Sequence, residues 1–161
     1  MDPSIETVSA IIRLDAGLFE KALDGLTREA LLRRVAPGVN PLIWIAGHLT
    51  GGRFSMAALL GETRTSPLAP AFGKGAVLPE DAALPRAEEV LAVWREISGI
   101  VAARLAAATP EQLAAPAQRR LPAGVQHVLG GLTFLTYHEG YHLGQMALIR
   151  KSLGLPGLVD A

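Results

Sequence analysis

The sequence contains no cysteine among its 161 residues. Disulfide bridges and thiolate metal sites are therefore excluded, because both need cysteine sulfur. Any metal ion that the chain binds must be held by nitrogen or oxygen atoms. The four histidines are thus the first residues to consider as metal ligands.

A surplus of charge of either sign is also missing. Fifteen Lys and Arg residues balance fifteen Asp and Glu residues, and they are scattered along the chain without runs. A surface that binds nucleic acid typically carries a basic stripe, so this composition argues against a nucleic-acid partner.

Long hydrophobic runs are absent as well. No apolar stretch approaches about eighteen residues without a polar break, so no membrane partner is expected. The first residues include Asp2 and Glu6 and lack the basic start and apolar core of a signal peptide. We therefore expect a cytoplasmic protein, and a length of 161 residues favours one domain over residues 1–161.

Half of the residues are hydrophobic, and their spacing is helical. In the first segment apolar residues recur at three- and four-residue steps, which is typical of an amphipathic helix. Asn40 and Pro41 predict the sharpest helix start, with Asn40 as N-cap and Pro41 at the first helical position. Gly61 and Gly154 are typical helix stops. The sequence predicts an all-α four-helix bundle with long helices at about 4–23, 41–60, 86–108 and 124–153, and brief turns after Thr27 and Thr109.

A long connection, residues 61–85, separates the second and third predicted helices. It is rich in proline and glycine, which do not favour regular structure. A connection of this length in a compact domain is usually functional or wraps an edge.

The most informative motif is His138-Glu139-Gly140-Tyr141-His142 in the last predicted helix. Residues four apart stack on one helix face, so both imidazoles can reach a single divalent ion. Metalloproteases use the same H-E-x-x-H spacing with a third ligand downstream. The metzincin extension would need Gly and His where this chain has Gln145 and Leu148, and Asp160 is the sole carboxylate of the tail. The protease interpretation therefore fails.

A better third ligand lies upstream, at His48 in a second apolar helix. Packing of the two helices can bring His48 opposite the pair formed by His138 and His142. This predicts a three-histidine metal site in a helix bundle, with remaining coordination positions open to water or substrate.

Two polar residues near the histidine pair have alternative interpretations. Glu139 is displaced about 100° around the helix from His138, so it is either a catalytic general base or a carboxylate that supports a ligand or points outward. Gln145 follows His142 by three residues and donates either to a ligand or substrate, or across a helix–helix contact.

The remaining candidates are further from the predicted ion. His127 falls on nearly the same face as His138 but about 16 Å away, so a structural or surface role is favoured over a position in a pocket wall. Arg53 either binds an anionic group of a cofactor or forms a surface salt bridge. Tyr137 and Tyr141 either line the pocket or pack in the core. Packing is the simplest interpretation of Trp44 and Trp94.

Four segments, residues 44–49, 59–61, 137–145 and 149–154, together resemble the DinB-like family of four-helix metal-binding proteins. The most specific part is the His-x-x-x-His-x-Gly-Gln run at 138–145, paired with the distant His48-Leu49. Phe72-Gly73-Lys74-Gly75 is also similar to a loop that many members carry before their third helix.

This resemblance implies a bundle with a crossing connection, often a homodimer, and a bound divalent ion, commonly zinc or nickel. The family's three-histidine site maps onto His48, His138 and His142. It does not imply one reaction: some members transfer low-molecular-weight thiols such as bacillithiol or mycothiol, one group isomerises maleylpyruvate, and many have no assigned activity.

Two hypotheses of different classes follow. In the first, the protein is a metal-dependent enzyme, thiol S-transferase-like or hydrolase-like, that acts on a small electrophilic substrate, with or without a low-molecular-weight thiol as cofactor. In the second, it is a non-catalytic, metal-stabilised dimeric helical module. Three ligands favour the first hypothesis, because a structural ion usually has four protein ligands.

Overall fold

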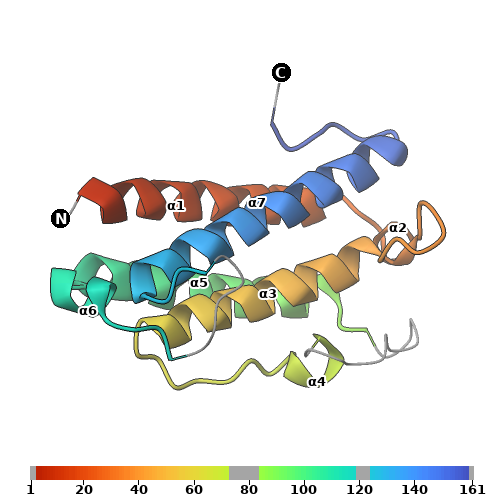
Figure 1. Cartoon of the computed structure of the whole chain (residues 1–161). Helices are drawn as coiled ribbons and strands as arrows, with labels where there is room; N and C mark the ends of the chain where they lie inside the picture. Colours follow the sequence, from red (N-terminus) through yellow and green to blue (C-terminus); the bar gives the residue numbers. More distant parts are fainter. Residues whose placement is uncertain (1–2, 73–83, 119–123, 160–161) are drawn as a thin grey trace.

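The computed structural model describes residues 3–72, 84–118 and 124–159, and these residues form helices and no strand. Four long helices make up most of the molecule (Figure 1). They are α1 (Pro3–Leu23), α3 (Leu42–Leu59), α5 (Ala87–Ala107) and α7 (Val128–Ser152). Three short helices lie between them: α2 (Arg28–Leu32), α4 (Ala69–Phe72) and α6 (Pro110–Ala114).

The long helices pack as a four-helix bundle, as the sequence predicts. α1 packs against α7 and α5, and α3 packs against the same two helices, so α1 and α3 stand diagonally across the bundle. The chain therefore crosses the bundle between its first and second long helices. Figure 1 shows α7 running antiparallel to α3, which places the middle of α7 beside the middle of α3.

Buried apolar residues fill the bundle in two clusters along its length. One cluster, which includes Phe19, Leu49 and Trp94, lies toward the start of α3 and the end of α7. The other, which includes Met56, Val101 and Leu132, lies toward the opposite end. The candidate site lies between α3 and α7, the two helices that mark the ends of these clusters.

Most predicted helix ends are confirmed. Thr27 and Thr109 cap α2 and α6, each accepting a hydrogen bond from the backbone amide three residues on. Gly61 and Gly154 follow α3 and α7 with φ values of 84° and 78°, in the left-handed region that ends helices.

Two predicted helix starts are wrong. α3 begins at Leu42 and Pro41 is its N-cap residue, so Asn40 does not hold the N-cap position. α7 begins at Val128, four residues later than the prediction of 124. The reason is that Gly124 has a φ of 73° and that Ala117 and Val128 hydrogen-bond across to Gln126 and Ala115, which keeps this segment extended.

The long connection between α3 and α5 contains the short helix α4. Its Phe72 ring lies directly against Gly47 of α3, where a Cβ atom would overlap the ring. Residues 73–83, including the predicted Gly73-Lys74-Gly75 loop, and Asp160 lie outside the described residues.

None of the helices formed by the described residues combines the length and apolar character that a bilayer crossing requires.

Candidate metal centre

Three histidines meet between α3 and α7. His48 comes from the first half of α3, and His138 and His142 come from adjacent turns of α7. One ring nitrogen from each lies within 4.8 Å of the others, and all three side chains are partly buried. The structure thus brings together the three residues that the sequence predicts as ligands.

The spacing of these nitrogens suits a divalent ion. Nε2 of His48 lies 3.0 Å from Nε2 of His138. Two nitrogen ligands at tetrahedral angles around zinc lie about 3.3 Å apart, given zinc–nitrogen bonds of ~2.0–2.1 Å. The cluster could therefore hold a metal ion with little movement, and its all-nitrogen donors suit zinc, nickel or a similar ion.

The electrostatic state of the cluster also favours a cation. Burial, together with repulsion from the neighbouring His142 and His48, lowers the pKa of His138 to about 4. Burial likewise lowers the pKa of His48 and of His142. All three imidazoles are consequently neutral near pH 7, which is the state in which imidazole binds a metal.

Two neighbours set the orientation of the ligand rings. The indole of Trp44 stacks on the His48 ring, with centroids 5.2 Å apart and planes 7° from parallel. Gln145 Oε1 lies 2.7 Å from Nδ1 of His142 and accepts a hydrogen bond from the Nδ1–H group, which leaves Nε2 of that ring for an ion. Gln145 Nε2 in turn donates to the Tyr141 hydroxyl.

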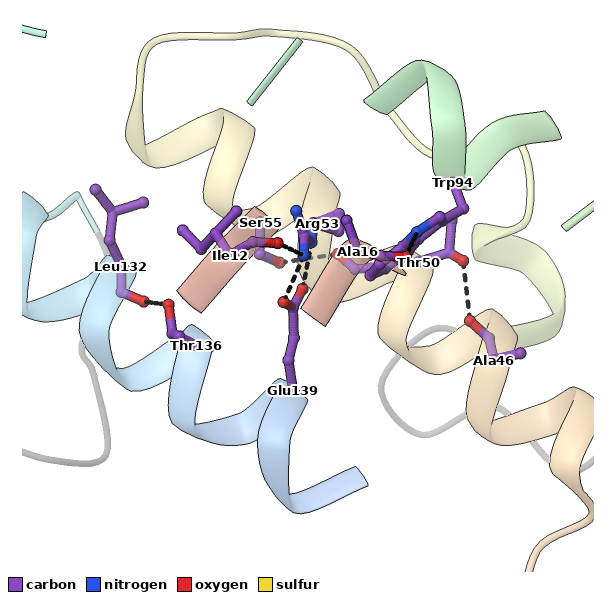
Figure 2. Close-up of polar contacts among 11 residues, drawn as sticks. Ile12, Ala16, Ala46, Thr50, Arg53, Ser55, Trp94, Leu132, Thr136 and Glu139 are labelled. Carbon is purple, nitrogen blue, oxygen red and sulfur yellow. Dashed lines mark hydrogen bonds and ion pairs between the residues drawn. The ribbon is translucent and has the colours of Figure 1, made fainter. Parts of the chain in front are cut away.

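Arg53 forms a buried ion pair with Glu139, the residue that follows His138 (Figure 2). Arg53 Nε and Nη2 donate to the two carboxylate oxygens at 2.6 Å and 2.8 Å, and Nη2 also donates to the Ile12 carbonyl of α1. The guanidinium lies 4.5 Å from the centre of the Trp94 ring. Burial raises the pKa of Glu139, and Arg53 opposes this shift. The pair ties α3, α7 and α1 together at the centre of the bundle.

This geometry bears on two sequence hypotheses. Arg53 is 1% exposed and pairs with Glu139, so the predicted surface location of its salt bridge is wrong, while binding of an anionic cofactor group stays a prediction. The pairing follows from burial, because a charge inside an apolar helix bundle needs an opposite charge beside it. Both oxygens of Glu139 face Arg53, which favours a supporting carboxylate; its role as a general base stays a prediction.

Of the other candidates, Gln145 and Tyr141 touch His142, while His127 has a separate role. His127 caps α7, and its Nδ1 accepts a hydrogen bond from the Gly130 amide, so it has the structural role that was favoured, although it precedes the helix. Tyr137 and Tyr141 are 69% and 57% exposed, so core packing is wrong for both, and they line a shallow surface cavity. Gln145 contacts a ligand, as an acceptor and not as the predicted donor.

Two features of the site were not predicted. Trp44 precedes His48 by four residues, and this spacing was a signal that the two rings meet on one helix face. The partnership of Arg53 with Glu139 had a weaker signal, namely that Arg53 is the one charged residue of α3 and must be balanced once that helix is buried.

The structure thus defines the class as an all-helical bundle in which a three-histidine cluster that could hold a metal ion lies between two antiparallel helices. The chain belongs to the DinB superfamily, which it matches over residues 12–146, a range that contains all three histidines. A comparison with curated proteins gives no match. The extension of the domain over residues 1–161 stays a prediction, since the match covers a shorter range.

Proposed function

We propose that the protein is a metal-dependent enzyme that acts on a small electrophile by thiol transfer or hydrolysis. One observation carries the proposal: in the part of the chain that the structure describes, the cluster supplies three neutral imidazole ligands and no fourth protein ligand. A site with three protein ligands leaves a coordination position for water or a substrate, as catalytic zinc sites do.

The residues of the chain have distinct roles in this proposal. His48, His138 and His142 hold the ion, while Trp44 and Gln145 keep two of the rings in place. A bound divalent ion is a Lewis acid that makes a coordinated water or thiol ionise near neutral pH. Zinc or nickel, and a low-molecular-weight thiol as cosubstrate, are what membership of the family supports.

Activity assays with controlled metal content test the proposal. The purified protein is stripped of metal, reloaded with zinc or nickel, and assayed with small thiols plus an alkylating electrophile, and separately with activated esters. We expect turnover that depends on the metal and rises with pH toward about 7, as the coordinated nucleophile ionises. Equal turnover with and without metal would contradict the proposal.

The role of Glu139 is tested in the same assay with Glu139→Gln. A general base should cost about a hundredfold or more in rate with metal retained, because proton transfer contributes at least that factor. We expect a much smaller loss, because both carboxylate oxygens already bind Arg53.

A second function, a metal-stabilised dimeric module without catalysis, has one observation in its favour. The histidines come from two different helices, so an ion between them joins α3 to α7. In that case chelation should lower the thermal midpoint strongly, and no thiol or ester substrate should give metal-dependent turnover. A homodimer and a cytoplasmic location are proposals under either function.

A further inference from the structure

A cavity of about 590 Å³ lies at one end of the bundle. It is formed where the last turns of α3 meet α6 and the start of α7, which Figure 1 shows at the same end of the molecule. Its volume falls within the range of small-molecule sites. We call it the end cavity, and its described lining residues are Phe54, Ser55, Ala58, Leu59, Gly61, Gln112, Ala115, Pro116, Gln118 and Val128.

The end cavity and the histidine cluster lie along one face of α3. Ser55 follows His48 by seven residues and Leu59 follows it by eleven, so both project from nearly the same side of the helix as His48. At a rise of 1.5 Å per residue, Ser55 lies about 10 Å and Leu59 about 16 Å along the helix from His48. A molecule bound at the cluster therefore needs an extended tail to reach the cavity.

Between the two, α3 presents backbone without side chains. Gly51 and Gly52 occupy the turn after His48 and both are partly exposed. A Cβ atom at Gly51 would meet nothing within 4 Å, and at Gly52 it would meet only His138 Nδ1, at 3.8 Å. The helix surface between the cluster and the end cavity is thus open for a chain to lie on.

The lining of the end cavity selects an uncharged tail. Phe54, Leu59 and Val128 offer apolar surface, while Ser55, Gln112 and Gln118 offer neutral polar groups. No lining residue that the structure describes is charged. Gln112 Nε2 donates to the Leu60 carbonyl, which holds that amide in place at the wall.

We propose that the end cavity is a tail subsite for substrates of the histidine-bound metal. Such a substrate has a reactive head at the ion and an uncharged, mainly apolar tail that crosses Gly51 and Gly52 and ends in the cavity. This inference rests on the proposed function, since the head requires an ion with an open position.

Alkyl hydroxamates test it, because the hydroxamate group chelates the ion and the chain can be varied. Dissociation constants for zinc-loaded protein are measured by calorimetry with acetohydroxamate, octanohydroxamate and decanohydroxamate. A fourth ligand has the chain length of decanohydroxamate but carries a carboxylate at the end of its tail. We expect decanohydroxamate to bind at least about tenfold more tightly than acetohydroxamate, because each buried methylene contributes about fourfold. The carboxylate-ended chain should lose most of this gain.

Ala58→Trp fills the end cavity from an exposed position of α3, and Ala103→Trp is the matched control on an exposed position of α5. Ala58→Trp should remove most of the gain from the long tail while acetohydroxamate binds as before. Ala103→Trp should change neither the gain from the long tail nor the binding of acetohydroxamate. In amide NMR spectra, Gln112 should shift with decanohydroxamate and not with acetohydroxamate.

The outcomes separate the inference from the proposed function. If acetohydroxamate binds but long tails gain nothing, or if Ala58→Trp leaves their gain intact, the tail subsite is wrong and the open metal site stands. If acetohydroxamate does not bind the zinc-loaded protein, the open position is wrong, and the subsite falls with it.

Discussion

At the scale of single residues, each ring of the histidine cluster is held by different neighbours. Trp44 stacks on His48, and Gln145 accepts a hydrogen bond from His142. Nδ1 of His138 is buried without a hydrogen-bond partner, so this ring relies on packing and on its contact with His48. Of these neighbours, Gln145 is the one that fixes a tautomer, because it leaves Nε2 of His142 as the free lone pair.

Gln145→Ala should therefore weaken metal binding without abolishing it. Loss of a hydrogen bond to a ligand histidine typically costs tenfold to about a hundredfold in affinity. The measurement is a competition titration of the metal-free protein with a chelator of known affinity. Leu148→Ala, at an exposed position one turn further on, should leave the affinity unchanged; equal affinities for both variants would contradict the role of Gln145.

The buried pair of Arg53 and Glu139 makes a second prediction at this scale. Arg53→Met should lower the free energy of unfolding by about 3–5 kcal/mol, because it leaves a buried carboxylate without its partner. Combining it with Glu139→Leu should restore most of the loss, since no charge then stays in the core. Denaturant unfolding of the single and double variants measures both effects.

An exposed ion pair serves as the control for that experiment. Arg95 Nη2 lies 2.6 Å from Glu20 Oε2, but both side chains are substantially exposed. Arg95→Met should cost less than about 1 kcal/mol, because water already solvates both charges. A loss for Arg53→Met as small as that for Arg95→Met would contradict the burial of the central pair away from water.

At the scale of helices, the prediction from sequence succeeded where a pattern is local. Apolar periodicity indicated α1 and α5, apolar stretches that end at Gly61 and Gly154 indicated α3 and α7, and the threonine caps marked the short helices. The start of α7 was predicted too early because residues 126–128 pair with residues 115–117, a contact between segments that no local pattern reveals.

In the candidate site, too, local patterns were predicted and contacts between distant segments were not. The four-residue spacing of His138 and His142 predicts a shared ligand face by itself, and His48 was found as the complement of that pair. The partnership of Arg53 with Glu139 joins residues 86 positions apart and depends on the rotation of two packed helices, which the sequence does not specify. The end cavity also depends on where α6 rests on the bundle.

The contact between α4 and α3 yields a prediction for these elements. Gly47→Val should displace the Phe72 ring, which lies against the glycine, and overpacking of this kind costs about 1–3 kcal/mol. Metal affinity should fall as well, because Phe72 contacts Trp44 edge-on and Trp44 stacks on His48. Thermal unfolding and a metal titration measure the two effects.

Gly99→Ala is the matched control, since a Cβ at this exposed position of α5 meets nothing within 4 Å. It should stabilise the helix slightly or have no effect. Unchanged stability for Gly47→Val would mean that the α4 contact is absent in solution.

At the scale of the whole molecule, four exposed apolar residues gather on α1 and α7: Ile11, Leu14, Tyr137 and Tyr141. Three of them line one cavity of about 440 Å³, so they lie close together. A patch of this kind on a chain of zero net charge favours self-association, and a two-fold dimer is the commonest result.

We therefore predict a homodimer that buries this patch. Sedimentation at tens of micromolar, as an order of magnitude, should show dimers of the wild-type chain and monomers of the Ile11→Glu, Tyr137→Glu double variant. Ala102→Glu, at an exposed position of α5, should stay dimeric. A wild-type monomer at this concentration would contradict the prediction.

The most direct measurement of the metal centre is metal content combined with X-ray absorption on the wild type and on single histidine variants. We predict about one divalent ion per chain with nitrogen ligands, lost in His138→Ala and His142→Ala and nearly lost in His48→Ala, because one remaining pair of ligands binds weakly. His127→Ala should keep its ion, since that histidine only caps α7. A wild-type protein that binds no ion, an ion with only oxygen ligands, or a site that needs His127 and not His48 would contradict the three-histidine centre.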